Sequence, residues 1–369
     1  MLIGIPKEIK DHEYRVGATP SGVRALVKAG NQVRVQAHAG AVIGFSDDMY
    51  RQAGATIVAS ATEVYQAEMI IKVKEPQATE FSLLREGQIL FGYLHLAADP
   101  EQAKHLLERK VVGISYDTVI DKMGRLPLLI PSSEIAGRMS IQAGATALQI
   151  ANGGKGILLG GIPGVPPAEV VVLGGGILGT EALRMALGLG ASVTVLDVNV
   201  NRLRQLEELY APGLKTLVST ASAVEESVLK ADLVIGAVLI PGKSTPKVVP
   251  ADLVRRMEPG SVIVDPAIDQ GGCIETSRPT THSNPTYIHD GVVHYCVTNM
   301  PGACARTATQ GLTNATLPYA LQIANKSFKR ALQEDSGLMM GLNVCFGKIT
   351  NKVVAEDLGY EYCPPERLF

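Results

Sequence analysis

The sequence predicts an α/β protein with two doubly wound parallel-sheet domains, one of which is inserted into the other. Three observations carry this prediction. Short β-branched runs alternate with helical patterns from the first residue, a glycine-rich turn near residue 174 opens a second alternating series, and a helical segment follows that series. Alternation of strand and helix at this spacing implies right-handed βαβ units and parallel sheets covered on both faces.

The first alternating series occupies the N-terminal third of the chain. Its strand-like runs are MLIGIP, QVRVQA, ATIVAS, MIIKVK, QILFGYLH and VVGISYD, separated by helical patterns such as GVRALVKAG and DPEQAKHLLERK. A proline-containing segment, LPLLIPSSEIAG, interrupts the series. The stretch after it, EIAGRMSIQAGATALQIA, is helical in pattern and rich in Ala and Gly, which lets a helix approach another backbone closely.

The second series sets the expected domain boundaries. It runs through AEVVVLGGGILG, SVTVLDVN, ADLVIGAVL, SVIVDPAID and VVHYCVTNMPG, and the remaining residues have mostly helical patterns. A segment of that size folds alone only marginally, so we expect it to pack on the first domain. The predicted division is a discontinuous substrate domain, 1–128 plus 306–369, and an inserted domain, 129–305.

Composition excludes several classes of protein. The net charge of −2 provides no basic field for nucleic acid or an anionic membrane. No run approaches 18 apolar residues and the N-terminus is charged, which argues against a transmembrane helix or a secretory signal. Five scattered cysteines without a CxxC pair indicate reduced thiols. We expect a soluble cytoplasmic protein.

The strongest local signal is a GxGxxG motif between a strand and a helix. VVVL leads into Gly174, Gly176 and Gly179, a helical pattern follows, and the next strand ends at Asp197. The glycines permit the tight turn, the approach of a pyrophosphate and the packing of the helix on the sheet. Asp197 is placed to accept hydrogen bonds from the adenosine ribose and repels a 2′-phosphate. The inserted domain is therefore predicted to be a Rossmann domain that binds NAD rather than NADP.

Polar residues that follow predicted strands are candidates for a site, because ligands of open α/β sheets lie beyond the carboxyl ends of the strands. These residues are Arg15, Lys74 and His95 in the first domain and Asp269 and Asn299 in the second. Arg15 and Lys74 suit a carboxylate and a second oxygen. His95 suits proton transfer. Asp269 suits orienting the imidazole or a water, or stabilising a developing cation.

The choice between two lysines stays open at this level, and the remaining histidines give no metal site. Lys72 has almost the same claim as Lys74, because strand residues two apart share a face. His282 and His294 have no spaced carboxylate or thiol partner, and no HxxxH or Cys/His cluster is present, so no metal is expected. The redox cofactor is then the reactive group, and the protein supplies binding and proton transfer.

Over essentially its whole length the chain resembles the L-alanine dehydrogenase family. The matching segments are IGIPKEIKDHEYRVGATP, IIKVKEP, FGYLHLA, PLLIPSSEIAGRMSIQAG, VVVLGGGILGTEA, AIDQGGC and VVHYCVTNMPGA. The resemblance implies reversible oxidative deamination of L-alanine to pyruvate and ammonium with NAD. It implies that Arg15 and Lys74, rather than Lys72, bind substrate and that His95 and Asp269 are the acid–base pair. The implied cofactor residues are Ser133, Asp197, Arg202, Ser219, Val238, Ile268, Asn299 and Met300. A homo-oligomer, commonly a hexamer, is also implied.

Four features depart from the usual family pattern. They are Pro266, Ser132, the segment Cys304-Ala305-Arg306 and the pair Gln310-Gly311. Proline at 266 fixes φ and removes an N–H, which affects the placement of Ile268 and Asp269. Three alternative functions remain open: the NAD-binding portion of a proton-translocating transhydrogenase, a saccharopine-type dehydrogenase of larger amino acids, and an NAD-binding module with a disabled site.

Overall fold

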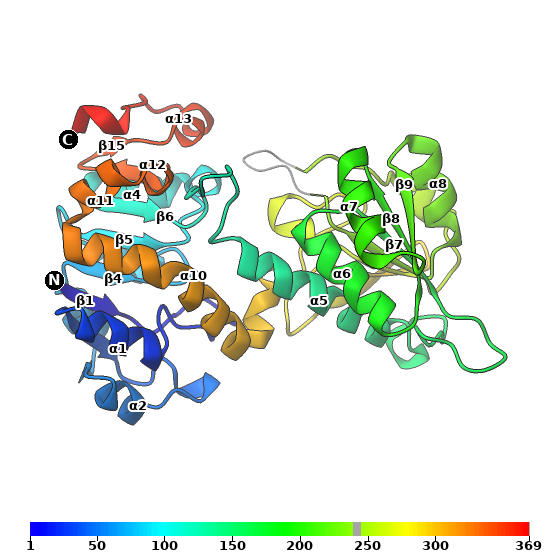
Figure 1. The fold of residues 1–369 in the computed structure, drawn as a ribbon, viewed down its shortest axis with the longest axis horizontal. Helices are drawn as coiled ribbons and strands as arrows, with labels where there is room; N and C mark the ends of the chain where they lie inside the picture. The colour runs from blue at the N-terminus through cyan, green and yellow to red at the C-terminus, as the bar shows by residue number, and fades with distance from the viewer. Residues whose placement is uncertain (239–244, 369) are drawn as a thin grey trace. The chain divides into compact units, whose positions relative to one another are not determined.

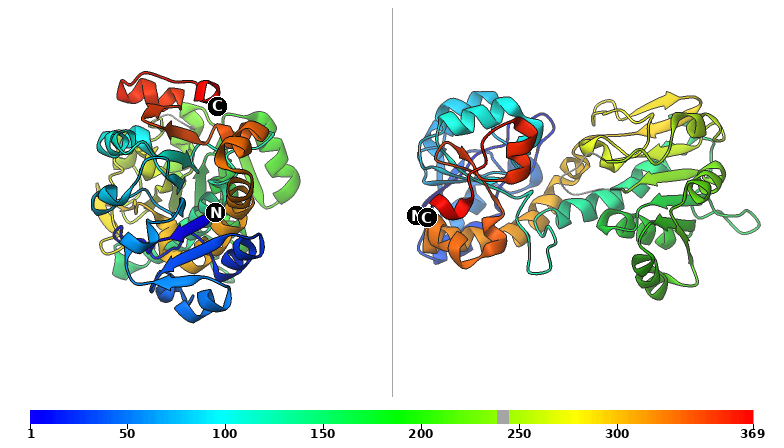
Figure 2. Two further views of the ribbon diagram at one scale, coloured as in Figure 1. Left: turned by 90° about the vertical axis from the view of Figure 1, so that its left-hand side faces the viewer. Right: turned by 90° about the horizontal axis from the view of Figure 1, so that it is seen from above.

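The structure is a computed structural model that describes residues 1–238 and 245–368. The chain divides into two compact units. Unit 1 combines Met1–Ser132 with Gly302–Phe369, and unit 2 is Ser133–Pro301. The predicted cuts at 128/129 and 305/306 each lie four residues from the observed ones. The units are described separately below (Figures 1 and 2).

Unit 1 is built on an eight-stranded sheet. Its strands, in chain order, are β1 (Leu2–Ile5), β2 (Gln32–Gln36), β3 (Thr56–Val58), β4 (Met69–Ile71), β5 (Ile89–Gly92), β6 (Val112–Ser115), β14 (Leu342–Cys345) and β15 (Lys348–Ile349). The order across the sheet is β15-β14-β6-β5-β4-β1-β2-β3. The pairs from β3 to β6 are parallel, whereas β14 pairs antiparallel with β6 and with β15.

Helices cover both faces of this sheet, as the alternation of its side chains requires. In β4, Met69 and Ile71 belong to one core cluster and Ile70 belongs to another. The first cluster is covered by α1 (Pro20–Lys28), α2 (Asp47–Gln52), α10 (Ala305–Lys326), α11 (Phe328–Glu334) and α12 (Ser336–Met339). The second is covered by α3 (Ala61–Val64), α4 (Pro100–Glu108) and α13 (Lys352–Leu358). Figure 1 shows α1 and α10 in front of the sheet.

The C-terminal segment differs from the mostly helical prediction in one respect. Its helices are present, but β14 and β15 extend the sheet of unit 1, with Cys345 opposite Val112. All four residues of β14 are buried. A buried run this short has no polar alternation, so its pattern does not distinguish a strand from part of a helix. The segment returns to the N-terminal part of the chain, and its first helix packs on α1.

Unit 2 contains a seven-stranded sheet. Its strands are β7 (Glu169–Leu173), β8 (Ser192–Asp197), β9 (Leu214–Val218), β10 (Leu233–Gly236), β11 (Val262–Val264), β12 (Thr286–His289) and β13 (Val292–Tyr295). The order is β12-β13-β11-β10-β7-β8-β9. With the antiparallel edge strand β12 set aside, this is the 3-2-1-4-5-6 order of dinucleotide-binding sheets. The first six strands of unit 1 have the same order.

The two faces of the second sheet are also covered. Val170 and Val172 of β7 pack with α5 (Ile130–Ala147), α6 (Ile177–Gly188) and α7 (Val200–Tyr210), whereas Val171 and Leu173 pack with α8 (Ala221–Lys230) and α9 (Ala251–Arg255). Short 3₁₀ helices complete the fold: η1 (Ala41–Ile43), η2 (Ala78–Leu83), η3 (Leu96–Ala98), η4 (Ile150–Asn152), η5 (Pro266–Gln270), η6 (Met300–Cys304) and η7 (Pro365–Leu368). The predicted fold class is confirmed.

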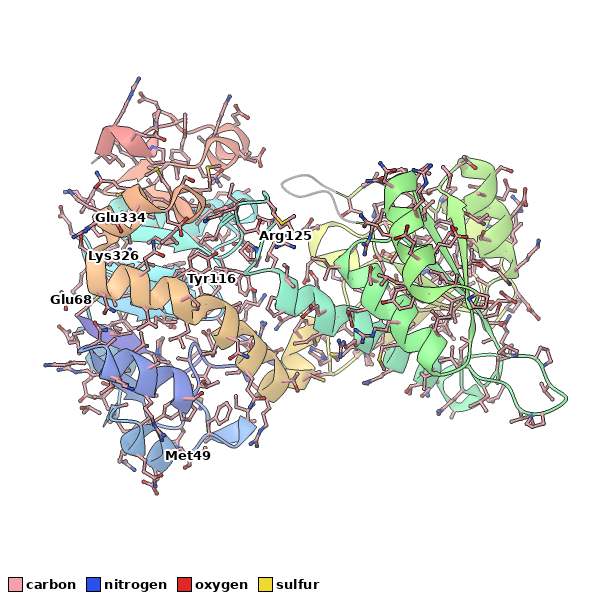
Figure 3. The ribbon with its side chains drawn as sticks, in the orientation of Figure 1. Met49, Glu68, Tyr116, Arg125, Lys326 and Glu334 are labelled. Carbon is pink, nitrogen blue, oxygen red and sulfur yellow. The ribbon has the colours of Figure 1, made fainter. Side chains whose placement is uncertain are left out.

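Aromatic packing in unit 1 bears on the candidate site. Tyr116, labelled in Figure 3, is fully buried, and its ring meets Phe91 and Tyr93 edge to face at 4.5 and 5.1 Å between centroids. Tyr93 is thereby fixed at the end of β5, next to the residues considered below. Among the helices of residues 1–238 and 245–368, none combines the length and apolar character needed to cross a membrane.

Candidate active site

The strand order of unit 1 brings its predicted site residues to one edge of the sheet. Strand β1 pairs in parallel with β4, β4 with β5, and β5 with β6, so the carboxyl ends of these strands lie at the same edge. Arg15 follows β1, Lys74 follows β4, and His95 follows β5. The direction of connection reverses between β1 and β4, which is where ligands of doubly wound sheets bind.

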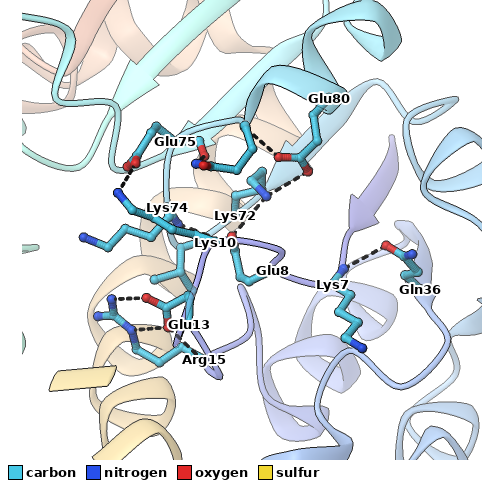
Figure 4. Close-up of polar contacts among 12 residues, drawn as sticks. Lys7, Glu8, Lys10, Glu13, Arg15, Gln36, Lys72, Lys74, Glu75 and Glu80 are labelled. Atoms are coloured by element: carbon cyan, nitrogen blue, oxygen red, sulfur yellow. Dashed lines mark hydrogen bonds and ion pairs between the residues drawn. The ribbon is translucent and has the colours of Figure 1, made fainter. Parts of the chain in front are cut away.

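Arg15 is held by a carboxylate two residues before it. Its Nε donates to Oε1 of Glu13 at 2.8 Å and its Nη2 donates to Oε2 at 2.6 Å, as Figure 4 shows. Both side chains are almost completely buried. Burial alone would lower the pKa of Arg15, but the hydrogen bonds and charge of Glu13 outweigh it and raise that pKa. The bidentate contact therefore fixes the plane of a guanidinium that stays charged.

The structure distinguishes the roles of Lys72 and Lys74. The ammonium of Lys72 is fully buried, 3.1 Å from Oε2 of Glu8 and 3.0 Å from Oε1 of Glu80 (Figure 4). These two carboxylates raise the pKa of Lys72 against the effect of burial. Lys74 is only half-buried. Because β4 ends at Ile71, both lysines lie outside the strand, where the alternation used in the sequence argument no longer applies.

Glu8 links the segment after β1 to the segment after β4. Its Oε1 accepts the backbone N–H of Val73 at 2.7 Å and that of Lys74 at 3.4 Å. Burial raises the pKa of Glu8, and the charge of Lys72 opposes the rise. The backbone that carries Lys74 is thus attached to a buried charge network formed by Glu8, Lys72 and Glu80.

His95 lies just beyond β5 in an uncommon backbone conformation. Its φ and ψ are 47° and 38°, in the left-handed region. The imidazole is about half exposed, with Nδ1 3.1 Å from Oδ1 of Asp117, and it stacks on Tyr93 with centroids 5.7 Å apart. Tyr93 donates to the carbonyl of Leu128 at 2.7 Å, and burial raises its pKa to about 12. Ser132, one of the departures, lies 3.3 Å from the same hydroxyl.

Sequence reasoning missed four carboxylates that contact these cations and the imidazole: Glu8, Glu13, Glu80 and Asp117. Asp117 follows β6 by two residues, so the rule that selected His95 was sufficient to find it. Glu8 lies three residues after β1, the spacing at which Lys74 follows β4, so the same rule was sufficient to find it as well. Glu13 lies eight residues after β1, and no periodicity identifies it or shows that it pairs with Arg15 two residues later.

The glycine turn of unit 2 has the geometry that the motif predicts. Gly174 has a φ of 99°, which L side chains rarely adopt. A Cβ on Gly179 would lie 1.9 Å from the carbonyl oxygen of Gly174, so the helix packs there only without a side chain. Gly176 caps the N-terminus of α6, and a Cβ at that position would meet no atom within 4 Å. The space beside the first amides of α6 suits a pyrophosphate.

Asp197 and Arg202 lie against this turn. Asp197 ends β8, and its Oδ2 accepts the N–H of Gly175 at 2.7 Å. Arg202 donates through Nε to the carbonyl of Gly175 at 2.7 Å. The N–H of Ser219, just after β9, donates to the carbonyl of Asp197 at 3.0 Å. Open space at Gly176, helix amides and a carboxylate at the end of β8 together fit a dinucleotide such as NAD.

The remaining predicted residues of unit 2 follow neighbouring strands. Val238 follows β10, while Ile268 and Asp269 lie in η5 after β11. Asp269 is exposed, and its Oδ2 lies 3.4 Å from the backbone nitrogen of Asn299. Met300 is buried against Ala136 and Val297. Ser133 is half-buried in α5.

The segment around Asp269 accommodates the unusual proline. Pro266 occupies the first position of η5, where its fixed φ and missing N–H are compatible with a helix start. The loop that follows is held by Lys247, whose ammonium donates to the carbonyls of Gly271 at 2.5 Å, Gly272 at 2.9 Å and Ile274 at 3.3 Å. Buried Asp265 accepts the N–H of Cys273. Within the described residues no group of three His, Cys, Asp or Glu is arranged to hold a metal ion.

Comparisons with known proteins show the family of the chain. Residues 4–136 match the family model of the alanine dehydrogenase/PNT N-terminal domain, and residues 140–352 match that of the C-terminal domain. The alanine dehydrogenase of Halomonas elongata is 56% identical over 363 residues, 98% of each chain.

Two solved structures are also similar to this one. An L-alanine dehydrogenase superposes with a TM-score of 0.95 at 51% identity, covering 97% of this chain and 99% of that one. A transhydrogenase from Sinorhizobium meliloti gives a TM-score of 0.81 at 25% identity, with 95% and 100% covered. The full-length similarity and the two domain matches have one consequence: the chain belongs to the alanine dehydrogenase/PNT family.

Proposed function

We propose that the protein is an NAD-dependent oxidoreductase that converts L-alanine, NAD⁺ and water to pyruvate, ammonium, NADH and a proton, and also catalyses the reverse reaction. The observation that carries the proposal is the arrangement of Arg15, Lys74 and His95 after neighbouring strands of one sheet. The similarity to alanine dehydrogenases over the whole chain supports the choice of substrate. By this proposal unit 1 binds the amino acid and unit 2 binds NAD.

The two cations of unit 1 bind the carboxylate of the substrate. Arg15 presents a planar fork whose plane Glu13 fixes, and Lys74 supplies a point charge from a segment that Glu8 holds. Fixing the carboxylate directs the Cα–H bond toward the ring that accepts the hydride. Positioning of this kind contributes about 7–11 kcal/mol where the reacting atoms are near attack geometry.

His95 and Asp269 form the acid–base pair, in which His95 transfers protons and Asp269 assists electrostatically. NAD, when bound, supplies the hydride acceptor. His95 takes a proton from the substrate ammonium, so that the neutral amine loses hydride from Cα and becomes an iminium. His95 passes that proton to solvent and, neutral again, takes a proton from the water that adds to the iminium carbon. It returns this proton to the nitrogen, and the C–N bond breaks as the hydroxyl becomes the carbonyl of pyruvate and gives its proton to the departing ammonia. The carboxylate of Asp269 stabilises the cationic iminium. General acid–base help of this kind contributes about 10²–10⁴-fold.

The residues that we assign to NAD all belong to unit 2. They are Ser133, Gly174, Gly176, Gly179, Asp197, Arg202, Ser219, Val238, Ile268, Asn299 and Met300. A carboxylate at Asp197 repels the 2′-phosphate of NADP, which favours NAD.

The direct test is an absorbance assay of NADH formation with the purified chain across a panel of amino acids and 2-hydroxy acids. We expect turnover with L-alanine, and slower turnover with close neighbours such as serine or 2-aminobutyrate, because one methylene discriminates by about 1–3 kcal/mol. His95→Ala should abolish turnover and leave NADH binding intact. Full activity of His95→Ala, or activity on 2-hydroxy acids alone, would refute the proposal.

A second candidate is the NAD-binding portion of a proton-translocating transhydrogenase, which the similarity to the Sinorhizobium meliloti structure favours. That function needs a membrane partner. NADH formation from alanine by the isolated chain therefore distinguishes the two candidates.

We further propose that the protein is cytoplasmic and forms a homo-oligomer, with six copies as the expected number. Leu158, Ile162 and Val165 of unit 2 are each more than half exposed. Apolar side chains gathered on one segment suit burial against a second copy. Light scattering coupled to size exclusion measures the mass, and a monomer at micromolar concentration would contradict this part.

A further inference from the structure

Asp117, two residues beyond β6, contacts both the backbone and the ring of His95. We propose that Asp117 is a positioning residue that holds the imidazole in the tautomer with a bare Nε2, ready to accept the substrate proton. This inference depends on the proton-transfer role proposed for His95. Nothing in the strand pattern singles out Asp117 for that role, and the contacts below carry it.

One oxygen of Asp117 fixes the backbone of His95. Oδ2 accepts the N–H of Leu94 at 3.0 Å, the N–H of His95 at 3.0 Å and the hydroxyl of Ser115 at 2.6 Å. Three donors on one oxygen leave the carboxylate little freedom to rotate. Since His95 adopts a φ of 47°, which is uncommon for a residue with a side chain, these bonds stabilise a conformation that the chain does not otherwise prefer.

The second oxygen faces the ring. Oδ1 is buried and accepts no hydrogen bond of standard geometry from the described residues. His95 Nδ1 lies 3.1 Å from it, within hydrogen-bond distance, so a small rotation of the ring aligns Nδ1–H with Oδ1. An ionised carboxylate is an acceptor only, and therefore Nδ1 carries the proton. A neutral imidazole with Nδ1–H has its lone pair on Nε2.

Tyr93 restricts the ring from another side. The planes of the Tyr93 and His95 rings are 4° from parallel, with centroids 5.7 Å apart. The hydroxyl of Tyr93 is bonded to the carbonyl of Leu128, and its ring packs on Tyr116, so this surface is itself fixed. Asp117 determines which nitrogen of His95 carries the proton, and Tyr93 restricts the plane of the ring.

This assignment gives different roles to the carboxylates of Asp117 and Asp269. The sequence argument left Asp269 three options, of which orienting the imidazole was one. Asp117 performs that orientation from within unit 1. Asp269 retains the roles of orienting water or stabilising the cation, and its own contact is with the backbone of Asn299.

The informative variant is Asp117→Asn. Its single amide oxygen takes over the contacts of Oδ2, so its NH₂ group faces Nδ1 and forces the proton onto Nε2. We expect kcat to fall by about 10²–10⁴-fold, the range of general acid–base catalysis, with the dissociation constant of NADH unchanged. Asp117→Glu keeps a carboxylate and should recover much of the loss. Asp357→Asn, the same change at an exposed site on α13, should behave as wild type.

The tautomer is measured without turnover. Nitrogen-15 NMR of histidine-labelled protein, with the His95 signals assigned by their absence in His95→Ala, distinguishes protonated Nδ1 from protonated Nε2. We expect Nδ1–H in the wild type and Nε2–H in Asp117→Asn. Protonated Nε2 in the wild type would overturn the inference, even if the variant fails to fold. An Nδ1–H wild type that lacks activity on alanine would instead refute the proposed function and leave the positioning role intact.

Discussion

At the scale of single residues, burial and charge pairing explain why Lys72 stabilises the fold, whereas Lys74 is the lysine that we propose to bind substrate. Lys72 satisfies two carboxylates that are themselves buried, Glu8 and Glu80, and Glu80 also accepts the hydroxyl of Tyr65 at 2.8 Å. Removing one member of such a network leaves an uncompensated charge in the interior. Lys74 has no comparable burial, so the two lysines should respond differently to the same substitution.

The matched pair Lys72→Met and Lys74→Met tests this difference. We expect Lys72→Met to lower the free energy of unfolding by about 3–5 kcal/mol, because Glu8 and Glu80 lose their shared cation. Lys74→Met should unfold like the wild type but show a raised KM for pyruvate. Urea titrations and initial-rate kinetics measure the two effects. Equal stability of the two variants would contradict the assignment of Lys72 to the fold.

His294 makes the stability of unit 2 dependent on pH. It is fully buried in β13, its Nδ1 lies 3.0 Å from the carbonyl of Val292, and its Nε2 lies 2.8 Å from Oγ1 of Thr276. Burial lowers its pKa from 6.5 to about 4. Between these values the unfolded chain binds the extra proton and the folded chain does not. The contribution of His294 is therefore complete above pH 6.5 and is lost as the pH falls toward 4.

We expect this loss to reach about 3 kcal/mol, since a shift of about 2.5 pKa units corresponds to about 1.36 kcal/mol per unit. Unfolding free energies at pH 7 and pH 4 are compared for the wild type and His294→Gln, which has no titrating ring. The wild type should lose more stability on acidification than the variant. His38→Gln, at an exposed histidine, should follow the wild type, and an identical pH dependence of all three proteins would exclude the effect.

At the scale of elements, most of the strands that sequence reasoning identified are buried on both faces, while β2 and β3 were identified as β-branched runs although they are partly exposed. The runs VVVL, SVTVLD and VIV are apolar because helices cover both sides of their sheet, and they correspond to β7, β8 and β11. The strands β9, β12, β14 and β15 were not predicted. β9 and β12 are largely exposed edge strands with mixed polarity, β14 is a buried run whose pattern does not distinguish a strand from part of a helix, and β15 has only two residues. β14 joins the sheet through β6, which is distant in sequence, whereas β9, β12 and β15 each pair with the strand next to them in the chain.

In the candidate site, too, some residues were predictable from the sequence and others were not. Residues at strand ends were predictable because a parallel sheet collects its carboxyl ends at one edge, which selects Arg15, Lys74 and His95. Glu8 and Glu13 lie in the same irregular segment as Arg15, and nothing in its pattern shows which of its charges pair with which, so these two partners were missed. The distinction between Lys72 and Lys74 required the observed end of β4.

The turn before α6 separates the requirements of folding from those of binding. A Cβ at Gly179 would overlap the carbonyl of Gly174, whereas a Cβ at Gly176 would enter open space. We expect Gly179→Ala to lower the melting temperature markedly. Gly176→Ala should melt like the wild type but bind NADH more weakly, because its methyl group occupies the position proposed for the pyrophosphate. Calorimetry and NADH fluorescence measure these outcomes, and unchanged NADH affinity in Gly176→Ala would remove the pyrophosphate from this turn.

At the scale of the whole molecule, the two units share the strand order 3-2-1-4-5-6 but differ at the switch point. Unit 2 has a glycine turn and helix amides there, which suit phosphate. Unit 1 has a buried arginine and two lysines, which suit a carboxylate. By the function proposed above, the same topology serves two ligands of different chemistry, one in each unit.

Hydrogen exchange measured by mass spectrometry tests that assignment across the chain. NADH at about 100 times its Kd stabilises whatever binds it by about 2.7 kcal/mol. We expect NADH alone to slow exchange around Gly174–Gly179 and Asp197 in unit 2. Further addition of a substrate-like carboxylate such as oxamate should slow exchange in the segments after β1 and β4 of unit 1. Gly176→Ala is the control, in which the response to NADH should shrink. Protection by NADH confined to unit 1 would contradict the division, since the two switch points would then have exchanged ligands.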